Sequence, residues 1–565
     1  MKHLIYIGLV FLITISLTGC LSSEKEEKSD EKILIEATGN EKPFGEDRRI
    51  YKYDKEDGVI NLYITVLSEK ETGKNTPSFF DLNHWYDMNP ISTDSPKLDV
   101  IIQEGNENGP QKNSFGYGTN KANASIQIRG NTNRLGNQKS YKIKLEDQAG
   151  LWLGQNTINL NKHQFDFTRV RNKLSFDYFK LIPNLTSLRT NFVRLYVKDL
   201  TSEPRNQHFE DFGLYTQIEQ PNKRFLSSHG LDPNGHLYKA TEFSFYKNPE
   251  QLKPENDPAF DEEQFESILE IKGSNDHEKL LSMLKDVNDY SVNINDIIEK
   301  HFDRDNYLTW LAVNILLGNH DTVTQNFYLY SPLNSSTWYF LPWDYDGAWD
   351  WEKQQQNMSA VTWEEGVSNY WGVVLHKRFL KDQRNVDELS QKIESLSKII
   401  TPSQTKEFLD HYYKIVHPYV SSSPDSDFLP IKIDQYKKYY YEMIHVPEKN
   451  KEKYYVNIQK PMPIFLQAHT TSNKVTVFEW EAAYDLQGDN VTYTFQLSKE
   501  PSFKKIVVEK KDIIDLNTTV SNLPKGIYYW KVISRDQYDH EQVAFDMYED
   551  EEGQLFYGVQ ELIVN

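Results

Sequence analysis

The hydrophobic pattern changes its period along this chain, and the order of the changes limits the fold. The first part has the two-residue period of β-strands, in the segments 59–66, 98–102, 124–129 and 140–145. Helical spacing follows, most clearly in 303–317, where apolar side chains share one face and Gly318 ends the helix. This order predicts an α+β domain over 49–452, with a β-rich lobe at about 49–240 and a helical lobe at about 241–452.

The last part of the chain returns to the period of strands after the proline-containing segment 461–463. Short alternating segments lie at 475–480, 492–497 and 528–532. Their spacing predicts a separate all-β, immunoglobulin-like sandwich over 458–565. The positions of Trp480 and of the later aromatic strands resemble those of a fibronectin type III domain, which implies a spacer or docking module without chemistry of its own.

The first twenty residues have the pattern of a lipoprotein signal sequence. Lys2 precedes an apolar run over 4–17 that is too short for a comfortable membrane span, and the run ends in Leu17-Thr18-Gly19-Cys20. Cys20 is the only cysteine and stands where a diacylglyceryl group would be attached. We expect a signal peptide over 1–20, a disordered charged tether over 21–48, and a protein held by lipid on the outer face of the cell membrane. The alternative is an uncleaved membrane anchor.

The charge argues against a nucleic-acid-binding protein, and the cysteine content excludes a disulfide-stabilised fold. The chain has 83 acidic and 63 basic residues and a formal charge of -20, which disfavours a nucleic-acid partner. One cysteine cannot form an internal disulfide framework, so ordinary hydrophobic cores must hold the 565 residues together.

Two stretches after the central helix carry the residues with the clearest chemical potential. Asp321 and Asn326 have the spacing that protein kinases use for a catalytic base and a metal-binding amide. A predicted β-hairpin between Asn326 and Asp344 would bring the two side chains back together, with Asp346 close by. Phosphoryl transfer needs a carboxylate that orients the attacking hydroxyl and oxygen ligands that hold Mg²⁺. The alternative for the first pair is an Asx-turn.

An upstream loop supplies a candidate phosphate clamp. Gly130 and Gly136 lie between two predicted strands, in a loop with the basic residues Arg129, Arg134, Lys139 and Lys142. Backbone N–H groups and cations in such a loop can bind phosphates. A basic, glycine-containing loop is nevertheless more often simply solvated.

Several motifs, in order, resemble those of the spore coat protein H (CotH) kinase-like family. They are Arg129-Gly130-Asn131 with Lys139-Ser140-Tyr141-Lys142, and the segments 170–174, 212–215 with 218–220, 235–239, 319–330 and 342–346. The resemblance runs from about 95 to 450. It implies a two-lobed, atypical, secretory-type kinase that uses ATP with Mg²⁺ or Mn²⁺ to phosphorylate serine on exported or coat proteins.

The resemblance also implies roles for single residues. Asp321 would be the catalytic base, Asn326 and Asp344 would bind the metal, and Lys142 would hold the α- and β-phosphates. Asp346 would either share the metal or brace its turn.

For the residues that would bind the nucleotide, the resemblance leaves more alternatives open. Lys139 and Lys144 rival Lys142, and the acidic partner of the lysine is Glu219 or Asp177. Arg129 and Gly130 complete the candidate nucleotide site.

Two functions fit this set of residues. The first is an extracellular protein serine kinase, which we favour because every residue it needs is present. The second is a catalytically inactive, kinase-like surface scaffold for adhesion or assembly, which would bind a protein or a polysaccharide, in part through the C-terminal domain.

Overall fold

The computed structural model describes residues 45–564 apart from 91, 93, 131–132, 204, 206, 352–362 and 473. The predicted signal sequence, Cys20 and most of the predicted tether lie outside these residues. The described chain begins at Gly45, and the Arg48 guanidinium already donates to the backbone carbonyl oxygens of Lys180 (2.8 Å) and Leu185 (3.0 Å). No helix in the described part of the chain has the length and apolar character needed to cross a membrane.

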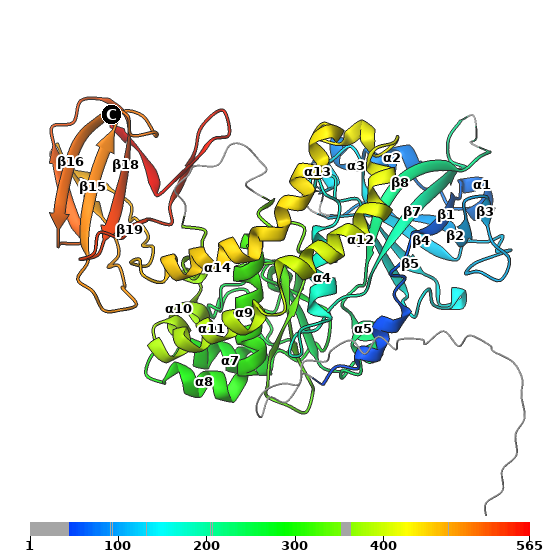
Figure 1. The fold of residues 1–565 in the computed structure, drawn as a ribbon, viewed down its shortest axis with the longest axis horizontal. Coiled ribbons are helices and arrows are strands. Elements are labelled where there is room, and N and C mark those ends of the chain that lie inside the picture. The colour runs from blue at the N-terminus through cyan, green and yellow to red at the C-terminus, as the bar shows by residue number, and fades with distance from the viewer. Residues whose placement is uncertain are drawn as a thin grey trace, which may run out of the picture. The chain divides into compact units, whose positions relative to one another are not determined.

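A closed sheet forms the first half of the molecule (Figure 1). Its strands are β1 (Ile60–Val66), β2 (Leu98–Asn106), β3 (Gly109–Pro110), β4 (Ala124–Arg129), β5 (Ser140–Leu145), β6 (Thr157–Asn161), β7 (Thr190–Asp199) and β8 (Glu210–Ile218). The order is β1-β7-β8-β6-β5-β4-β2-β3, and β1 also pairs with β2, which closes the sheet into a barrel. All pairs are antiparallel except β1 with β7. The short helices beside these strands are α1 (Glu69–Thr72), α2 (Phe79–Asn83) and α3 (Trp85–Met88).

A small second sheet and many helices form the next part. The strands β9 (His236–Ala240), β10 (Leu269–Ile271), β11 (Phe327–Ser331) and β12 (Tyr339–Pro342) pair in the order β10-β9-β11-β12. The helices are α4 (Arg171–Phe179), α5 (Lys223–Ser228), α6 (Glu262–Glu266), α7 (Glu278–Val287), α8 (Ile294–His301), α9 (Arg304–Leu317), α10 (Val374–Leu380), α11 (Gln383–Leu396), α12 (Pro402–Val420), α13 (Ile433–Glu442) and α14 (Val446–Asn457).

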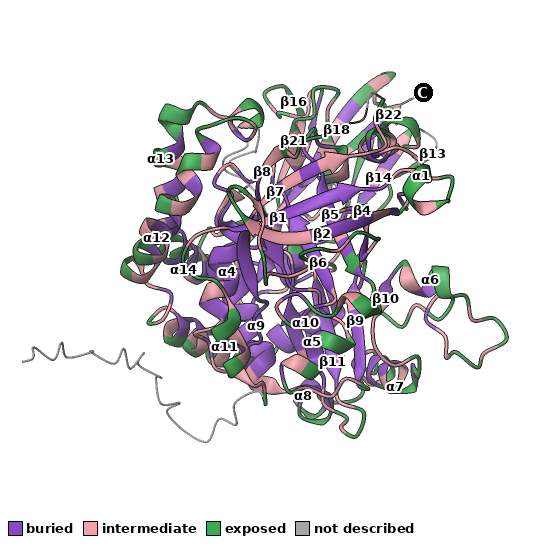
Figure 2. Cartoon of the chain, turned by 90° about the vertical axis from the view of Figure 1, so that its right-hand side faces the viewer, coloured by how far each residue is buried: buried purple, intermediate pink, exposed green. Residues whose placement is uncertain are grey.

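Helix α9 is the central helix of this part and confirms the helix predicted over 303–317. The Asp303 side chain caps its first turn by accepting from the Asn306 backbone N–H, and Gly318 ends it in a left-handed conformation with φ of 58°. Nearly every residue between these caps is buried, so α9 packs on all sides rather than on one stripe. Figure 2 shows the same concentration of buried residues in α9 and in the strands of the barrel.

The C-terminal region is built from strands. They are β13 (Thr470–Ser472), β14 (Val475–Glu479), β15 (Thr492–Ser498), β16 (Ile506–Ile513), β17 (Asn517–Ser521), β18 (Gly526–Arg535), β19 (Glu541–Val543), β20 (Met547–Glu549), β21 (Leu555–Tyr557) and β22 (Val559–Val564). One sheet has the order β13-β14-β17, a second has the order β16-β15-β18-β19 with β22 also on β18, and β20 pairs with β21 in a separate two-stranded sheet. Phe478 of the first sheet and Trp530 of the second lie in one hydrophobic core, with ring centroids 5.0 Å apart. The structure as a whole is therefore a mixed helix and sheet protein with several sheets.

Candidate functional site

A β-hairpin positions the two predicted metal ligands. Strands β11 and β12 pair antiparallel with Phe327 opposite Pro342, which confirms the hairpin predicted from the sequence. Asn326 precedes the first strand and Asp344 follows the second, so both lie at the open end of the hairpin. Each has a φ of 57°, a left-handed conformation that Asn and Asp adopt more readily than most residues. Such backbone conformations concentrate at functional sites.

Asp321 reaches the same end of the hairpin from the turn after α9. It lies in the short 3-10 helix His320–Thr322. The Asn326 side-chain amide donates to Asp321 Oδ2 at 2.7 Å, and the Gln325 amide donates to Oδ1. Since Asn326 donates through Nδ2, its Oδ1 stays available as an acceptor.

Asp344 and Asp346 complete an acidic cluster with Asp321. Burial and the charges of Asp346 and Asp321 raise the pKa of Asp344 well above its usual value, and Arg129 opposes this rise. Burial also acts to raise the pKa of Asp346, but its contact with His163 Nδ1 at 3.2 Å, together with Asp344 and the charge of Arg129, outweighs burial, and the pKa lies below the usual value. Burial and the Asp346 charge raise the pKa of Asp321.

The cluster fits a divalent cation. Asp321 and Asp344 hold a proton more tightly than usual because they are buried and because the neighbouring carboxylates repel their negative charge. A bound cation relieves the same repulsion, and carboxylate and amide oxygens are the ligands that Mg²⁺ prefers. Asp344, Asp346 and the Oδ1 atom of Asn326 are the groups that would hold it.

The guanidinium group of Arg129 lies beside this cluster and has a hydrogen-bond donor that is unpaired among the described residues. It ends strand β4, and its guanidinium carbon lies 5.8 Å from the centre of the Trp343 ring. Its Nη1 atom is buried and has no hydrogen-bond partner in the described part of the chain. A buried donor without a partner is costly, so an anionic ligand at this position would be stabilised. Gly130, with φ of 89°, follows directly.

The three candidate lysines have different surroundings. Burial lowers the pKa of Lys142, as do the charges of Lys272 and Arg129, whereas Glu270 opposes the change. Lys139 Nζ instead donates to the backbone carbonyl of Arg134 at 2.8 Å, and Lys144 is exposed. Lys142 is therefore the lysine that shares an environment with Arg129, and through it with the acidic cluster.

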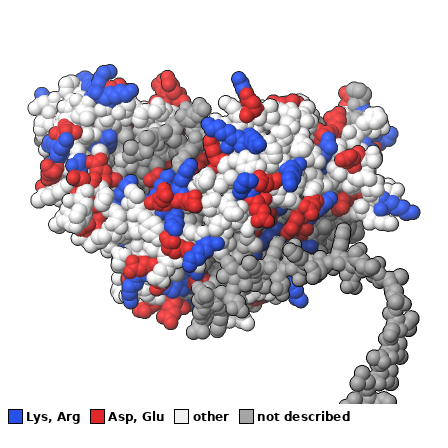
Figure 3. Space-filling model, viewed as in Figure 1, with Lys and Arg blue, Asp and Glu red and all other residues white. Residues whose placement is uncertain are grey.

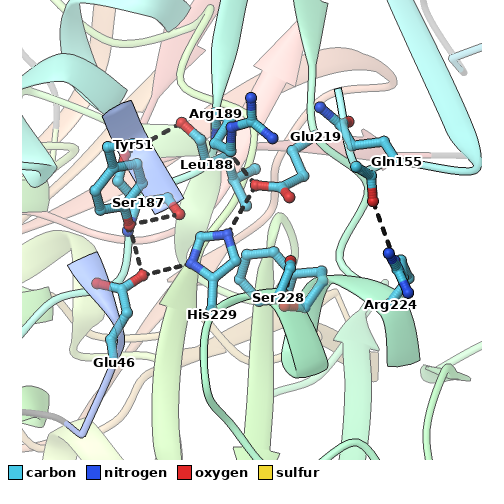
Figure 4. Close-up of polar contacts among 12 residues, drawn as sticks. Glu46, Tyr51, Gln155, Ser187, Leu188, Arg189, Glu219, Arg224, Ser228 and His229 are labelled. Atoms are coloured by element: carbon cyan, nitrogen blue, oxygen red, sulfur yellow. Dashed lines mark hydrogen bonds and ion pairs between the residues drawn. The ribbon is translucent and has the colours of Figure 1, made fainter. Parts of the chain in front are cut away.

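Glu219 lies in a different buried cluster, shown in Figure 4. Its Oε2 atom accepts from the Arg189 backbone N–H at 3.2 Å and contacts His229 Nε2 at 2.9 Å. The other ring nitrogen of His229 contacts Glu46 at 2.6 Å. Burial acts against the protonated ring, but the two glutamates outweigh it and raise the pKa of His229 to about 9.

Asp177 is occupied elsewhere as well. It pairs with Lys173 at 2.9 Å and with Lys180 at 2.7 Å. Glu270 is the acidic side chain whose charge acts on Lys142, and it pairs with Lys239 at 2.6 Å and with Lys272 at 2.7 Å.

Sequence reasoning did not find His163, Glu270 and Lys272. His163 is 183 positions away from Asp346, and the contact depends on how the barrel meets the hairpin. Lys239 lies within a motif shared with the resembled family, but the spacing gave it no role. Its position opposite Tyr328 follows from the pairing of β9 with β11.

The comparisons with known proteins agree with the family that the motifs indicate. The family model described as CotH kinase protein matches residues 126–454. Inner spore coat protein H of Bacillus subtilis (strain 168) is 26% identical over 238 residues, which are 42% of this chain and 61% of that protein. The chain thus matches less than two thirds of this relative's length.

A solved structure, the twitchin kinase region from C. elegans, is similar over 17% of this chain and 20% of that chain, with 15% identity and a TM-score of 0.13. A similarity of this size carries no argument about the fold. The family model, in contrast, covers more than half of the chain and spans both Arg129 and the acidic cluster. The chain belongs to the CotH kinase protein family.

Proposed function

We propose that this protein is an atypical, secretory-type protein kinase that transfers phosphate from ATP to serine on exported or coat proteins. Family membership supports kinase-like activity, and one observation supports the specific site. Asp321, Asn326, Asp344 and Asp346 gather at the open end of one hairpin, beside the Arg129 Nη1 atom, which has no hydrogen-bond partner among the described residues.

Each side chain has a task that its surroundings support. Mg²⁺ or Mn²⁺, held by Asn326, Asp344 and Asp346, would offset the charge of the phosphate oxygens. Asp321, fixed by two amide donors, orients the serine hydroxyl and accepts its proton. The serine oxygen then bonds to the γ-phosphorus as the bond to the bridging oxygen breaks, and ADP leaves. Arg129 and Lys142 donate to the phosphates.

Calorimetric titration of ATP, with and without Mn²⁺, tests this proposal together with a serine-phosphorylation assay. We expect metal-dependent ATP binding and autophosphorylation by the wild type. The variant Asp147→Asn, at an exposed aspartate, should match the wild type, and Asp344→Asn should lose both properties. A wild type that neither binds ATP nor phosphorylates serine would favour the inactive scaffold for adhesion or assembly.

We also propose that Cys20 anchors the protein to the outer face of the cell membrane. The support is the sequence pattern around the only cysteine of the chain. Labelling with a fatty acid tests it, because Cys20→Ala should abolish incorporation and leave an unprocessed precursor. Label retained by that variant would exclude the anchor.

The C-terminal region would then be a fibronectin type III-like sandwich that spaces the kinase domain or contacts a surface protein or polysaccharide. The two larger antiparallel sheets of this region share one core, which supports this architecture. We propose no nucleic-acid partner. The formal charge is -20, and on the face drawn in Figure 3 basic and acidic side chains lie intermixed.

A further inference from the structure

Three aspartates of the C-terminal region converge at one end of the strands β15 and β18 of its larger sheet. Asp485 and Asp489 lie in the loop between β14 and β15, and Asp536 directly follows β18. Strands β15 and β18 pair with Thr492 opposite Arg535, so the start of one strand adjoins the end of the other. One carboxylate oxygen from each aspartate lies within 4.8 Å of those of the other two.

Backbone N–H groups of the surrounding loops bind the Oδ1 atoms of the two buried carboxylates. Asp485 Oδ1 accepts from the backbone N–H groups of Gln487 (2.9 Å) and Asp489 (3.0 Å). Asp536 Oδ1 accepts from the backbone N–H groups of Tyr538 (2.8 Å) and His540 (2.9 Å). These contacts fix the direction of the two buried carboxylates.

The second oxygen of Asp485 lacks any such partner. Asp485 is only 6% exposed, and its Oδ2 atom is buried without a hydrogen-bond donor in the described part of the chain. A buried carboxylate oxygen is stable only when a donor or a cation satisfies it.

The charges around the three aspartates do not balance. Among the described residues no lysine or arginine pairs with them, and the contacting base is His540, whose Nδ1 lies 2.7 Å from Asp536 Oδ2. The neighbouring Arg535 pairs instead with Glu541 and Asp539. Three carboxylates therefore face at most one positive charge, and a divalent cation would supply what is missing.

We propose that Asp485, Asp489 and Asp536 bind a calcium ion. The ligand atoms of the cluster are carboxylate oxygens, which favours a hard cation over zinc or copper. Calcium is the better fit than magnesium because it accepts irregular oxygen sites assembled from loops, whereas magnesium demands a near-ideal octahedron.

The ion would also stabilise the junction with the preceding helical part. The loop that carries Asp485 contacts this part directly: Tyr484 donates to the Lys381 carbonyl at 3.2 Å, and Gln487 donates to the Ile458 carbonyl at 3.0 Å. Leu486, between them, is buried in the helical core. Fixing Asp485 therefore fixes residues on both of its sides that hold the two parts together.

Calorimetric titration of Ca²⁺ into the full chain, with excess Mg²⁺ present throughout, tests the proposal. On the proposed function, magnesium would fill the site around Asp344, so the heat would report on the new site. We expect one Ca²⁺ per chain with a Kd of roughly 10⁻⁴ to 10⁻³ M, the range of extracellular calcium modules, and a Ca²⁺-dependent rise in melting temperature.

Matched substitutions locate the site. Asp485→Asn and Asp489→Asn should each weaken Ca²⁺ binding at least tenfold, whereas Asp344→Asn and the exposed Asp515→Asn should leave it unchanged. Asp489 is only half-buried, so Asp489→Asn should still fold. It tests the calcium site if Asp485→Asn does not fold. The proposal is overturned if the wild type binds no Ca²⁺ up to 10 mM, a ceiling about tenfold above that range. It is also overturned if Asp485→Asn and Asp489→Asn both bind Ca²⁺ normally, or if Asp344→Asn alone abolishes binding.

Discussion

Asp321 and Asp344 belong to one acidic cluster, but their surroundings assign them different tasks. Both oxygens of Asp321 accept from side-chain amides, which suits a group that orients a hydroxyl. Asp344 faces Asp346 and Arg129, where a cation would bridge to phosphate. We therefore expect Asp321→Ala to abolish phosphoryl transfer while the affinity for Mn²⁺ and ATP stays within about twofold. Asp344→Ala should abolish transfer and weaken that affinity at least tenfold.

Calorimetry with ATP and Mn²⁺, run beside serine-phosphorylation assays, separates these outcomes. Asp147→Ala serves as the control for loss of an exposed carboxylate. Equal losses of nucleotide binding in both variants would contradict the division of roles.

A second residue-level prediction concerns His229. Its folded pKa is raised to about 9 from 6.5, so the protonated ring stabilises the fold fully below pH 6.5 and loses this effect as pH rises through 9. A shift of this size corresponds to about 3 kcal/mol. Urea unfolding at pH 6 and pH 9.5 should show a larger loss of stability in the wild type than in His229→Gln. The partly exposed His411→Gln should behave like the wild type, and an identical pH dependence in His229→Gln would refute the assignment.

The predictable residues of the site are those that lie close together in the sequence. Asp321, Asn326 and Asp344 are linked by one turn and one hairpin, and local spacing suffices to group them. His163 and Glu270 join the site through contacts between distant segments, and the partner of Glu219 proved to be His229 in a cluster that begins at Glu46. Local patterns carry no information on such contacts.

At the scale of elements, the same difference between local and distant contacts decides what was predictable. Helix α9 and the hairpin of β11 and β12 follow from periodicity and turn residues, and both are confirmed. The parallel pairing of β1 with β7, and the pairing of β1 with β2 that closes the barrel, join strands whose individual patterns look alike. Alternation of apolar and polar residues predicts that a segment is a strand, but it does not determine which other strand it pairs with.

The end of α9 provides a test of how this element positions the site. Gly318 has φ of 58°, and a Cβ atom there would lie 2.6 Å from Asn450 Nδ2. We expect Gly318→Ala to lower the free energy of unfolding by about 2 kcal/mol, from backbone strain and this contact together. Gly118 has φ of 76° and open space around it, so Gly118→Ala should cost only about 1 kcal/mol. Urea denaturation measures both, and equal losses would show that the Asn450 contact does not matter.

At the scale of the whole molecule, the family match and the C-terminal strands lie in different parts of the chain. The matched segment ends at residue 454, and the core of Trp480, Phe495 and Trp530 is made entirely from residues beyond it. A core formed within one segment is the physical requirement for independent folding.

We therefore expect the fragment 458–565 to fold alone into a β-rich structure. Its contacts with the helical part include a buried hydrogen bond from Gln542 to Ser368 at 3.0 Å and the stacking of Tyr484 on Trp371, with ring centroids 5.5 Å apart. Leu486 would also lose its place in the helical core. The fragment should thus give a strand-type circular dichroism spectrum and a cooperative melt, at a lower temperature than the same strands in the full chain. In the fragment the Leu486 side chain is exposed to water. Leu486→Ser should therefore make the fragment more soluble without lowering its free energy of unfolding. If the fragment 458–565 and its Leu486→Ser variant both gave a disordered spectrum, the strands would need the helical part in order to fold.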